Sequence, residues 1–194
     1  MPLEPLGTDF STSRKFFLDL DGTVADFLTP FAAYHGRRNP YDAPWRAAGK
    51  GSDFEFEAWL RNPRNWTSGV LSTPGFWDSL PVYPWAHGII RAARAWGSLV
   101  VLTSPGRDGA SSAAASGKLK WCLRALRIPA KDVVLCARKE LLAGPGRVLL
   151  DDYAVNIDAW RSAGGVGLLF PQPYNSNYKS CSRDPVEWLK EKLS

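Results

Sequence analysis

The architecture of this chain of 194 residues follows from one segment near its start, Lys15-Phe-Phe-Leu-Asp-Leu-Asp-Gly-Thr23. Its first half is a short apolar run of the length expected of a buried strand. Its second half is acidic and contains Asp21-Gly22, a dipeptide that is typical of turns. Because residues two apart on a strand point to the same side, Asp19 and Asp21 are expected to converge on one site. The segment therefore predicts a buried strand with a pair of carboxylates at its carboxyl end.

Helical patterns alternate with short apolar runs in the rest of the chain. Residues 24–34 carry apolar side chains at helical spacing, directly after the first strand. Further helices are predicted at 86–96, 118–126, 156–163 and from Asp184-Pro185 onward, and further strands at 98–103, 132–136, 147–151 and 165–170. Such alternation favours a parallel sheet that is covered on both faces. We therefore predict an α/β fold, a Rossmann-like parallel sheet flanked by helices.

The segment from about residue 37 to residue 84 has a different composition. It is rich in Pro, Gly, Trp and Arg, and no strand-like alternation is convincing there. We predict that residues 27–84 form a small, mainly helical cap inserted after the first strand. Residues 1–26 and 85–194 would then form the α/β core.

Composition excludes several classes of protein. With 45% hydrophobic and 22% charged residues and no low-complexity tract, the chain is neither disordered, fibrous nor a coiled coil. No apolar run approaches the roughly 20 residues that span a bilayer, and the first residues do not resemble a secretory signal. The 3 cysteines cannot pair completely and have no CxxC spacing, which argues against a disulfide framework and a zinc site. We therefore expect a cytoplasmic protein without a membrane partner.

Positive charge is concentrated in one part of the sequence. The formal net charge is +5, a modest excess. Between residues 118 and 139, however, a single acid, Asp132, stands against the basic residues Lys118, Lys120, Arg124, Arg127, Lys131, Arg138 and Lys139. Such a region favours an anionic partner.

Polar residues follow several of the predicted strands. Asp19 and Asp21 end the first strand, Thr103-Ser104 the next, and Asp151-Asp152 a later one. In α/β sheets, ligands bind at the carboxyl ends of the strands. An acidic cluster with only oxygen ligands suits Mg²⁺. Taken singly, Asp-Gly could be a simple turn and Asp-Asp a helix cap, but their occurrence together with Thr103-Ser104 favours a site.

These residues resemble the motifs of a known group of enzymes. Asp19-Leu-Asp-Gly-Thr23 resembles the first motif of the haloacid dehalogenase superfamily of aspartate-dependent phosphohydrolases. Thr103-Ser104 is similar to its second motif, Lys118 to its third and Val148-Leu-Leu-Asp-Asp152 to its fourth. The motifs occur in the order of the superfamily.

A narrower resemblance is to the 5′(3′)-deoxyribonucleotidases. It rests on four segments between residues 16 and 170: Asp19-Leu-Asp-Gly-Thr-Val-Ala-Asp-Phe27, Thr73-Pro-Gly-Phe-Trp77, Thr-Ser-Pro105 and Lys118-Leu-Lys-Trp121. The resemblance implies that Asp19 attacks phosphorus and that Asp21 acts as general acid and base. It also implies a Mg²⁺ ion held by Asp19, the backbone carbonyl of Asp21, Asp151 and Asp152.

The resemblance assigns substrate contacts as well. Thr103, Ser104 and Lys118 would donate hydrogen bonds to phosphate oxygens, and Lys139 resembles a further substrate-side lysine. Lys120 competes with Lys118 for this role. We prefer Lys118, because we expect it at the start of its helix, where Leu119, Cys122, Leu123 and Leu126 form the buried face. Phe27, Phe76 and Trp77 match family positions near the nucleobase, although buried aromatic residues are often simply core.

The leading hypothesis is a Mg²⁺-dependent nucleotidase that acts on nucleoside monophosphates. The alternative is a phosphatase with the same catalytic residues that acts on nucleic-acid ends or on another small phosphomonoester. The cap argues against nucleic acid, because polynucleotide ends need an open groove. A non-catalytic anion binder is disfavoured, since it would need neither carboxylate of the first motif. A homodimer is compatible with the sequence.

Overall fold

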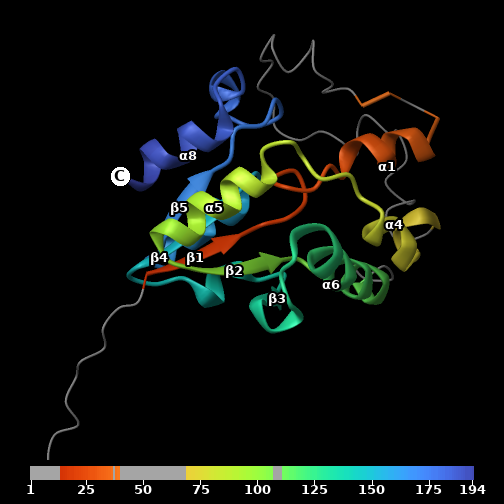
Figure 1. Cartoon of the computed structure of the whole chain (residues 1–194), viewed down its shortest axis with the longest axis horizontal. Helices are drawn as coiled ribbons and strands as arrows, with labels where there is room; N and C mark the ends of the chain where they lie inside the picture. Colours follow the sequence, from red (N-terminus) through yellow and green to blue (C-terminus); the bar gives the residue numbers. More distant parts are fainter. Residues whose placement is uncertain (1–13, 37, 40–68, 107–110) are drawn as a thin grey trace, which may run out of the picture.

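A single parallel sheet forms the centre of the protein. The computed structural model describes residues 14–36, 38–39, 69–106 and 111–194. Its strands have the order β3-β2-β1-β4-β5, with all neighbours parallel. They are β1 (Lys15–Leu18), β2 (Ser98–Thr103), β3 (Val133–Leu135), β4 (Arg147–Asp151) and β5 (Val166–Leu169). The predicted α/β class is confirmed, and the first predicted strand is the central one (Figure 1).

Helices surround this sheet. They are α1 (Leu28–Tyr34), α4 (Pro74–Asp78), α5 (Ala86–Trp96), α6 (Ser111–Leu126), α7 (Ala154–Ser162) and α8 (Pro185–Leu193). Short 3₁₀ helices are η2 (Gly69–Ser72), η3 (Ala130–Asp132), η4 (Lys139–Leu142) and η5 (Tyr178–Ser180). None of the helices in the described ranges is long and apolar enough to cross a membrane.

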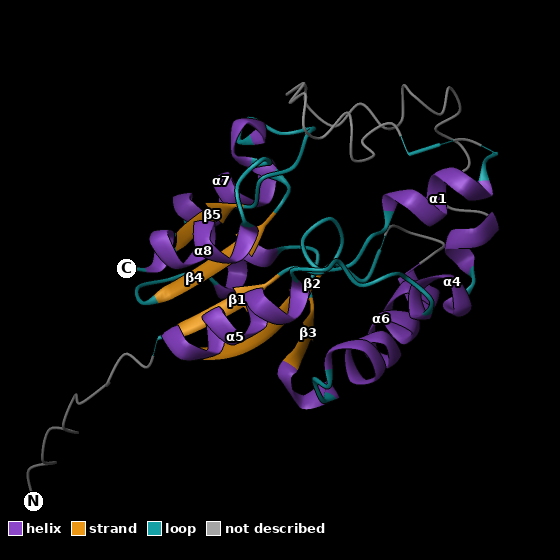
Figure 2. Cartoon of the chain, turned by 45° about the horizontal axis from the view of Figure 1, so that its top comes forward, coloured by secondary structure: helices purple, strands orange, loops and turns teal. Residues whose placement is uncertain are grey.

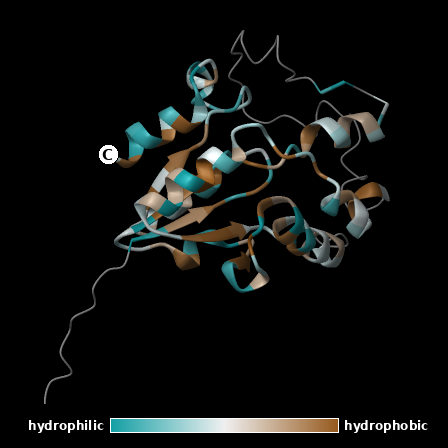
Figure 3. Ribbon diagram, in the orientation of Figure 1, coloured by the Kyte–Doolittle hydropathy of each residue, from teal (hydrophilic) through white to brown (hydrophobic). Residues whose placement is uncertain are grey.

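Alternate side chains of β1 enter two separate cores. Phe16 and Leu18 pack in the larger cluster, which includes residues of α5, α6 and α8. Phe17 points to the opposite face, where its ring lies 5.1 Å from that of Trp160 on α7. A strand with both faces buried must be apolar throughout, which explains the continuous run of β1. Figure 3 shows hydrophobic residues along the strands, with α5 lying in front of them.

The last helix begins where the sequence predicts it. Asp184 caps α8, because its carboxylate accepts hydrogen bonds from the backbone N–H groups of Val186 and Glu187, at 2.8 and 2.9 Å. Pro185 occupies the first turn, where no intrahelical hydrogen bond is needed from its nitrogen. The predicted cap of this helix is therefore confirmed.

The helix that carries Lys118 is longer than expected. It begins at Ser111, not at Lys118, so that Lys118 lies in its middle. The reason is the Ser- and Ala-rich segment before Lys118, because alanine has the highest helix propensity. The buried face also differs from the prediction. Cys122 and Leu126 are buried as predicted, but Leu123 is 59% exposed and Trp121 is buried instead.

A tight turn replaces the first part of the helix predicted at 24–34. The backbone N–H groups of Thr23, Val24 and Ala25 all donate to the carbonyl oxygen of Leu20. Helix α1 begins only at Leu28, after Asp26 accepts a hydrogen bond from the N–H of Thr29 at 3.1 Å. The turn holds the segment after β1 close to the end of the sheet.

The described parts of the predicted cap are helical. They contain α1, η2 and α4, which lie beyond the carboxyl ends of β1 and β2 (Figures 1 and 2). Residues 40–68 lie outside the described residues. The division into a core and a cap of residues 27–84 remains a prediction.

Candidate active site

Three strands bring polar residues to one edge of the sheet. Asp19 follows β1, Thr103 ends β2 and Asp151 ends β4. Since β1 lies between β2 and β4 in parallel register, these residues are neighbours at the carboxyl edge. All of them are buried. Buried polar groups at this edge need partners, and the surrounding loops and helices provide them.

An acidic cluster lies at this edge. Carboxylate oxygens of Asp19, Asp151 and Asp152 lie within 4.8 Å of one another. Asp151 is fixed by hydrogen bonds from the backbone N–H of Tyr153 and the side-chain amide of Asn156, both at 2.9 Å. The Asp21 carboxylate is not part of this cluster.

Burial and mutual repulsion act on the cluster. Burial raises the pKa of the Asp152 carboxyl well above its ordinary value, and the negative charges of Asp151 and Asp19 raise it further. Burial also raises the pKa of Asp151, although Lys139 opposes the shift. Removing these carboxylates from water is unfavourable unless a cation accompanies them.

Lys139 is one such cation. Its Nζ atom lies 2.6 Å from Asp19 Oδ1 and 2.6 Å from Asp151 Oδ2, and the residue is only 3% exposed. Burial alone would lower the pKa of Lys139, but the carboxylates of Asp151 and Asp19 raise it overall. The lysine therefore stays charged. It bridges the first and fourth motifs, in direct contact with the carboxylates.

Lys118 forms the corresponding bridge on the other side. Its Nζ atom donates to Asp21 Oδ2 at 2.5 Å, to Thr103 Oγ1 at 3.2 Å and to the Ser104 carbonyl oxygen at 2.8 Å. Lys118 is 3% exposed, whereas Lys120 is exposed. The structure thus places Lys118 in the site although it is not at the start of its helix.

Asp21 is suited to hold a proton. Burial raises the pKa of its carboxyl, Lys118 opposes this shift, and the charge of Asp19 reinforces it. Asp21 Oδ2 contacts Lys118, while Oδ1 is buried and has no hydrogen-bond partner within the described residues. A buried carboxylate oxygen without a hydrogen-bond donor favours the protonated form of the group.

The charges of the site leave room for a divalent cation. Even with Asp21 protonated, the three carboxylates of Asp19, Asp151 and Asp152 face the two ammonium groups of Lys118 and Lys139, so negative charge remains uncompensated when these three acids are ionised. The donors of the cluster are all oxygen atoms, as Mg²⁺ prefers. The residues present therefore fit a Mg²⁺ ion between Asp19, Asp151 and Asp152. The predicted role of the Asp21 backbone carbonyl remains a prediction.

The predicted base-binding residues form an aromatic cluster beside Lys118. Phe27 stacks on Trp77 with ring centroids 5.5 Å apart, and Phe76 meets Phe27 edge-on at 5.8 Å. Lys118 Nζ lies 4.8 Å from the centre of the Trp77 ring, a cation–π contact. Phe76 and Trp77 are only 8% and 5% exposed, whereas Phe27 is half-buried. Phe27 is therefore the more accessible of the three rings.

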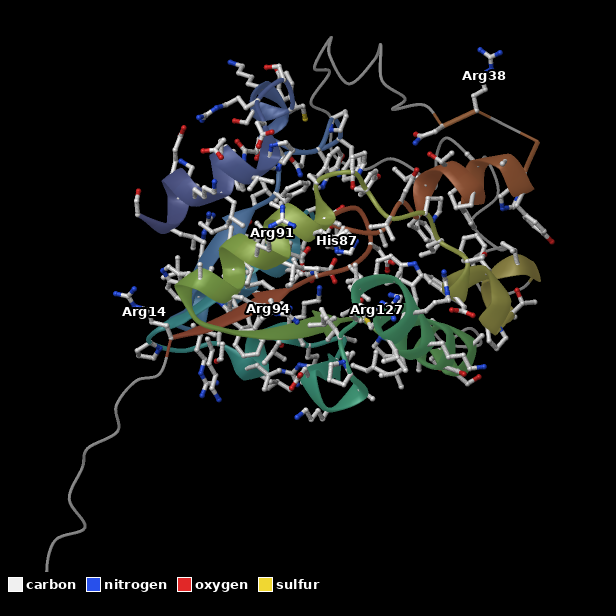
Figure 4. The ribbon with its side chains drawn as sticks, viewed as in Figure 1. Arg14, Arg38, His87, Arg91, Arg94 and Arg127 are labelled. Atoms are coloured by element: carbon white, nitrogen blue, oxygen red, sulfur yellow. The ribbon has the colours of Figure 1, made fainter. Side chains whose placement is uncertain are left out.

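The other basic residues between 118 and 139 lie away from the site. Arg124 pairs with Asp78 at 3.3 Å, and Arg138 pairs with Glu140 at 2.9 Å. Arg127 is exposed and directly follows α6; Figure 4 labels it together with the exposed Arg14, Arg91 and Arg94. Only Lys118 and Lys139 of the basic stretch enter the described site.

Sequence reasoning missed the loop that follows β5. Tyr174 donates a hydrogen bond from its hydroxyl to Asp152 Oδ2, and the Gln172 side-chain amide donates to the Gly22 carbonyl oxygen. Asn175 donates to the carbonyl oxygen of Asp152 at 2.8 Å. The available signal was the polar and aromatic run Gln172-Pro-Tyr-Asn175, just after a predicted strand end on the same edge of the sheet.

One of three comparisons with known proteins shows the family of this chain. A search of curated protein sequences found no match to this chain. A search of solved structures found the HAD domain of the effector protein Lem4 from Legionella pneumophila, an inactive mutant, at 10% identity and a TM-score of 0.36, covering 94% of this chain and 99% of that one. The family described as "5′ nucleotidase, deoxy (Pyrimidine), cytosolic type C protein" matches residues 14–192. The chain therefore belongs to this family of 5′-nucleotidases, and the enzyme is a phosphoric monoester hydrolase.

Proposed function

We propose that this enzyme is a Mg²⁺-dependent phosphatase that converts nucleoside monophosphates into nucleoside and phosphate through a phosphorylated Asp19. The observation that carries this proposal is the convergence of Asp19, Asp151 and Asp152 within 4.8 Å, next to the buried Lys118 and Lys139. The family description names deoxy and pyrimidine, which supports deoxypyrimidine monophosphates as substrates.

In the proposed reaction, a carboxylate oxygen of Asp19 attacks phosphorus and the bond to the nucleoside oxygen breaks. Asp21 donates its proton to that leaving oxygen, so the nucleoside departs as a neutral alcohol. A water molecule then attacks phosphorus, Asp21 takes its proton, and the bond to Asp19 breaks. Inorganic phosphate leaves and both carboxylates return to their initial state.

The cation and the lysines have separate proposed roles. A Mg²⁺ ion, held by Asp19, Asp151 and Asp152, would neutralise phosphate charge that otherwise repels the nucleophile. Lys139 holds Asp19 through its contact at 2.6 Å and so keeps one oxygen of the nucleophile in a fixed direction. Lys118, Thr103 and Ser104 would bind the oxygens of the transferred phosphoryl group.

Replacing Lys118 tests this arrangement against a matched control on the same helix. We expect Lys118→Ala to lower kcat/KM strongly, by roughly 10²- to 10³-fold, as removal of a charge-stabilising donor does in other enzymes. Lys120→Ala should leave kcat/KM unchanged, since Lys120 is exposed. Steady-state phosphate release from thymidine monophosphate measures both. A larger loss in Lys120→Ala would show that the third motif is wrongly assigned.

We propose that the base is selected by the aromatic cluster. Phe27 is half-buried although it stacks on both Phe31 and Trp77, so a base would contact the part of this cluster that stays exposed. Trp77 in turn contacts the phosphate-side Lys118. A base that stacks on an aromatic ring gains about 1–3 kcal/mol. The cluster could thus bind a nucleobase close to the phosphate site.

Phe27→Ala is expected to lower kcat/KM for thymidine monophosphate by roughly tenfold to a hundredfold, the equivalent of one lost stacking contact. Hydrolysis of p-nitrophenyl phosphate, which has no base, should change little. Trp77→Ala is the comparison variant. Trp77 is buried and donates a hydrogen bond to the Leu71 carbonyl oxygen at 3.0 Å, so this variant shows what the loss of a structural ring does to both substrates. Equal losses of Phe27→Ala on both substrates would mean that the ring supports only the fold.

The location and the assembly of the enzyme are further parts of this proposal. The family description contains the word cytosolic, which supports the predicted cytoplasmic location. A homodimer remains a prediction. Nucleic acid is not favoured as a partner, because a cap over the site would leave no open groove for a polynucleotide end.

A further inference from the structure

A polar loop closes the site from the side of the edge strand β5. Its residues Phe170, Gln172, Tyr174 and Asn175 are all buried. The loop is tied to β4 at its beginning, because the Phe170 N–H donates to the Asp151 carbonyl oxygen at 2.8 Å. Buried amides and hydroxyls are costly unless they are hydrogen-bonded, so the partners of these side chains fix their positions.

The partners of the loop lie in the first and fourth motifs. The Asn175 amide donates to the backbone carbonyls of Asp152 and Phe170, at 2.8 and 2.9 Å. The Gln172 amide donates to the Gly22 carbonyl oxygen, and the Tyr174 hydroxyl donates to Asp152 Oδ2. The loop thus connects the turn after β1 with the acidic end of β4.

Asp152 depends on this loop more than the other carboxylates do. Lys139 contacts Asp19 and Asp151, and Lys118 contacts Asp21. Within the described part of the chain, the donor to the Asp152 carboxylate is Tyr174. Its hydroxyl therefore sets the direction of a carboxylate that both neighbouring acids repel.

Gly22 makes this contact possible. Its φ of 73° lies in the left-handed region, which glycine adopts without strain. A Cβ atom at this position would also collide with the Asp152 carboxylate and the Tyr174 hydroxyl. The glycine of the first motif thus leaves the space in which Asp152 and Tyr174 meet.

We propose that Tyr174 is a positioning residue for the metal site, holding the Asp152 carboxylate in the direction in which it binds Mg²⁺. The inference rests on the metal site of the proposed function. Partners that orient metal ligands typically contribute a factor of 10 to 100 in metal affinity. In this role, the Tyr174 hydroxyl affects metal affinity through one carboxylate oxygen of Asp152. A residue that only supports the fold would change stability and not metal affinity.

The test measures the affinity of the full chain for Mn²⁺ in the absence of substrate. Electron paramagnetic resonance reports the concentration of free Mn²⁺ during the titration. We expect Tyr174→Phe to weaken Mn²⁺ binding by roughly tenfold to a hundredfold. The matched control is Tyr178→Phe, because Tyr178 begins η5, four residues after Tyr174, and its hydroxyl has no hydrogen bond within the described residues. This control should bind Mn²⁺ like the wild type. A higher Mg²⁺ concentration should restore most of kcat in Tyr174→Phe, because the variant binds the metal more weakly but keeps its ligands.

A double-mutant cycle separates positioning from support of the fold. In an Asp152→Asn background, Tyr174→Phe should cause little further loss of Mn²⁺ affinity, because the hydroxyl acts through Asp152. Additive losses would overturn the inference. A Tyr174→Phe variant that binds Mn²⁺ like the wild type would also overturn the inference. If this variant in addition had a lower melting temperature in EDTA, Tyr174 would support the fold and not the metal site. A wild type that binds no Mn²⁺ would instead remove the metal site itself, and this inference with it.

Discussion

Asp19→Asn is expected to abolish phosphate release from nucleoside monophosphates, with a loss in kcat on the order of 10⁴-fold or more, as for other removed nucleophiles. The amide keeps the shape of the side chain but is a poor nucleophile. Asp19 follows the central strand β1, and the Lys139 ammonium group, 2.6 Å from Asp19 Oδ1, holds one of its oxygens. In the proposed mechanism, the other oxygen attacks phosphorus.

The control for this variant is its fold. A side-chain amide oxygen can still accept the hydrogen bond from Lys139, so the melting temperature in EDTA should stay close to that of the wild type. Circular dichroism during heating measures it. Activity near that of the wild type in well-folded Asp19→Asn would exclude the covalent mechanism.

Asp21→Asn is expected to lower kcat by roughly 10²- to 10⁴-fold, the usual contribution of general acid–base catalysis. Burial raises the pKa of Asp21, which favours the protonated form that the first step needs, and Lys118 limits this shift. The variant removes the proton but keeps an acceptor for the Lys118 ammonium group. Single-turnover kinetics should show that both formation and hydrolysis of the phosphorylated enzyme are slower.

The leaving group provides the control for Asp21. A substrate such as p-nitrophenyl phosphate releases a stable anion and needs less protonation, so its first step should be slowed less than that of thymidine monophosphate. If Asp21→Asn slows the first step equally for both substrates, Asp21 is not the general acid.

Local sequence patterns predict the sheet well, for physical reasons. The strand at 98–103 and the helix at 86–96 agree with the observed bounds of β2 and α5, because their apolar patterns match the faces that they bury. The convergence of Asp19, Thr103 and Asp151 follows from parallel strands that end at one edge. The predicted beginning of α6, at Lys118, is wrong. Small residues such as Ala113 and Ala114 form a buried helical face there without a strong hydrophobic pattern in the sequence.

Contacts that depend on tertiary packing could not be predicted. The sequence favoured Lys118 over Lys120, but its pairing with Asp21 depends on how α6 packs against the end of the sheet. The bridge of Lys139 between Asp19 and Asp151 and the bond from Tyr174 to Asp152 join residues far apart in the sequence. No local pattern specifies such pairs.

Phosphate release from thymidine 5′-monophosphate, measured with Mg²⁺ and with EDTA, tests the proposed function most directly. We expect rapid release with Mg²⁺, none with EDTA, and recovery when excess Mg²⁺ is added back, because the cluster of Asp19, Asp151 and Asp152 offers only oxygen ligands. Release from a 5′-phosphorylated oligonucleotide should be much slower. Turnover of the nucleotide that persists in EDTA, or a preference for the oligonucleotide, would contradict the account.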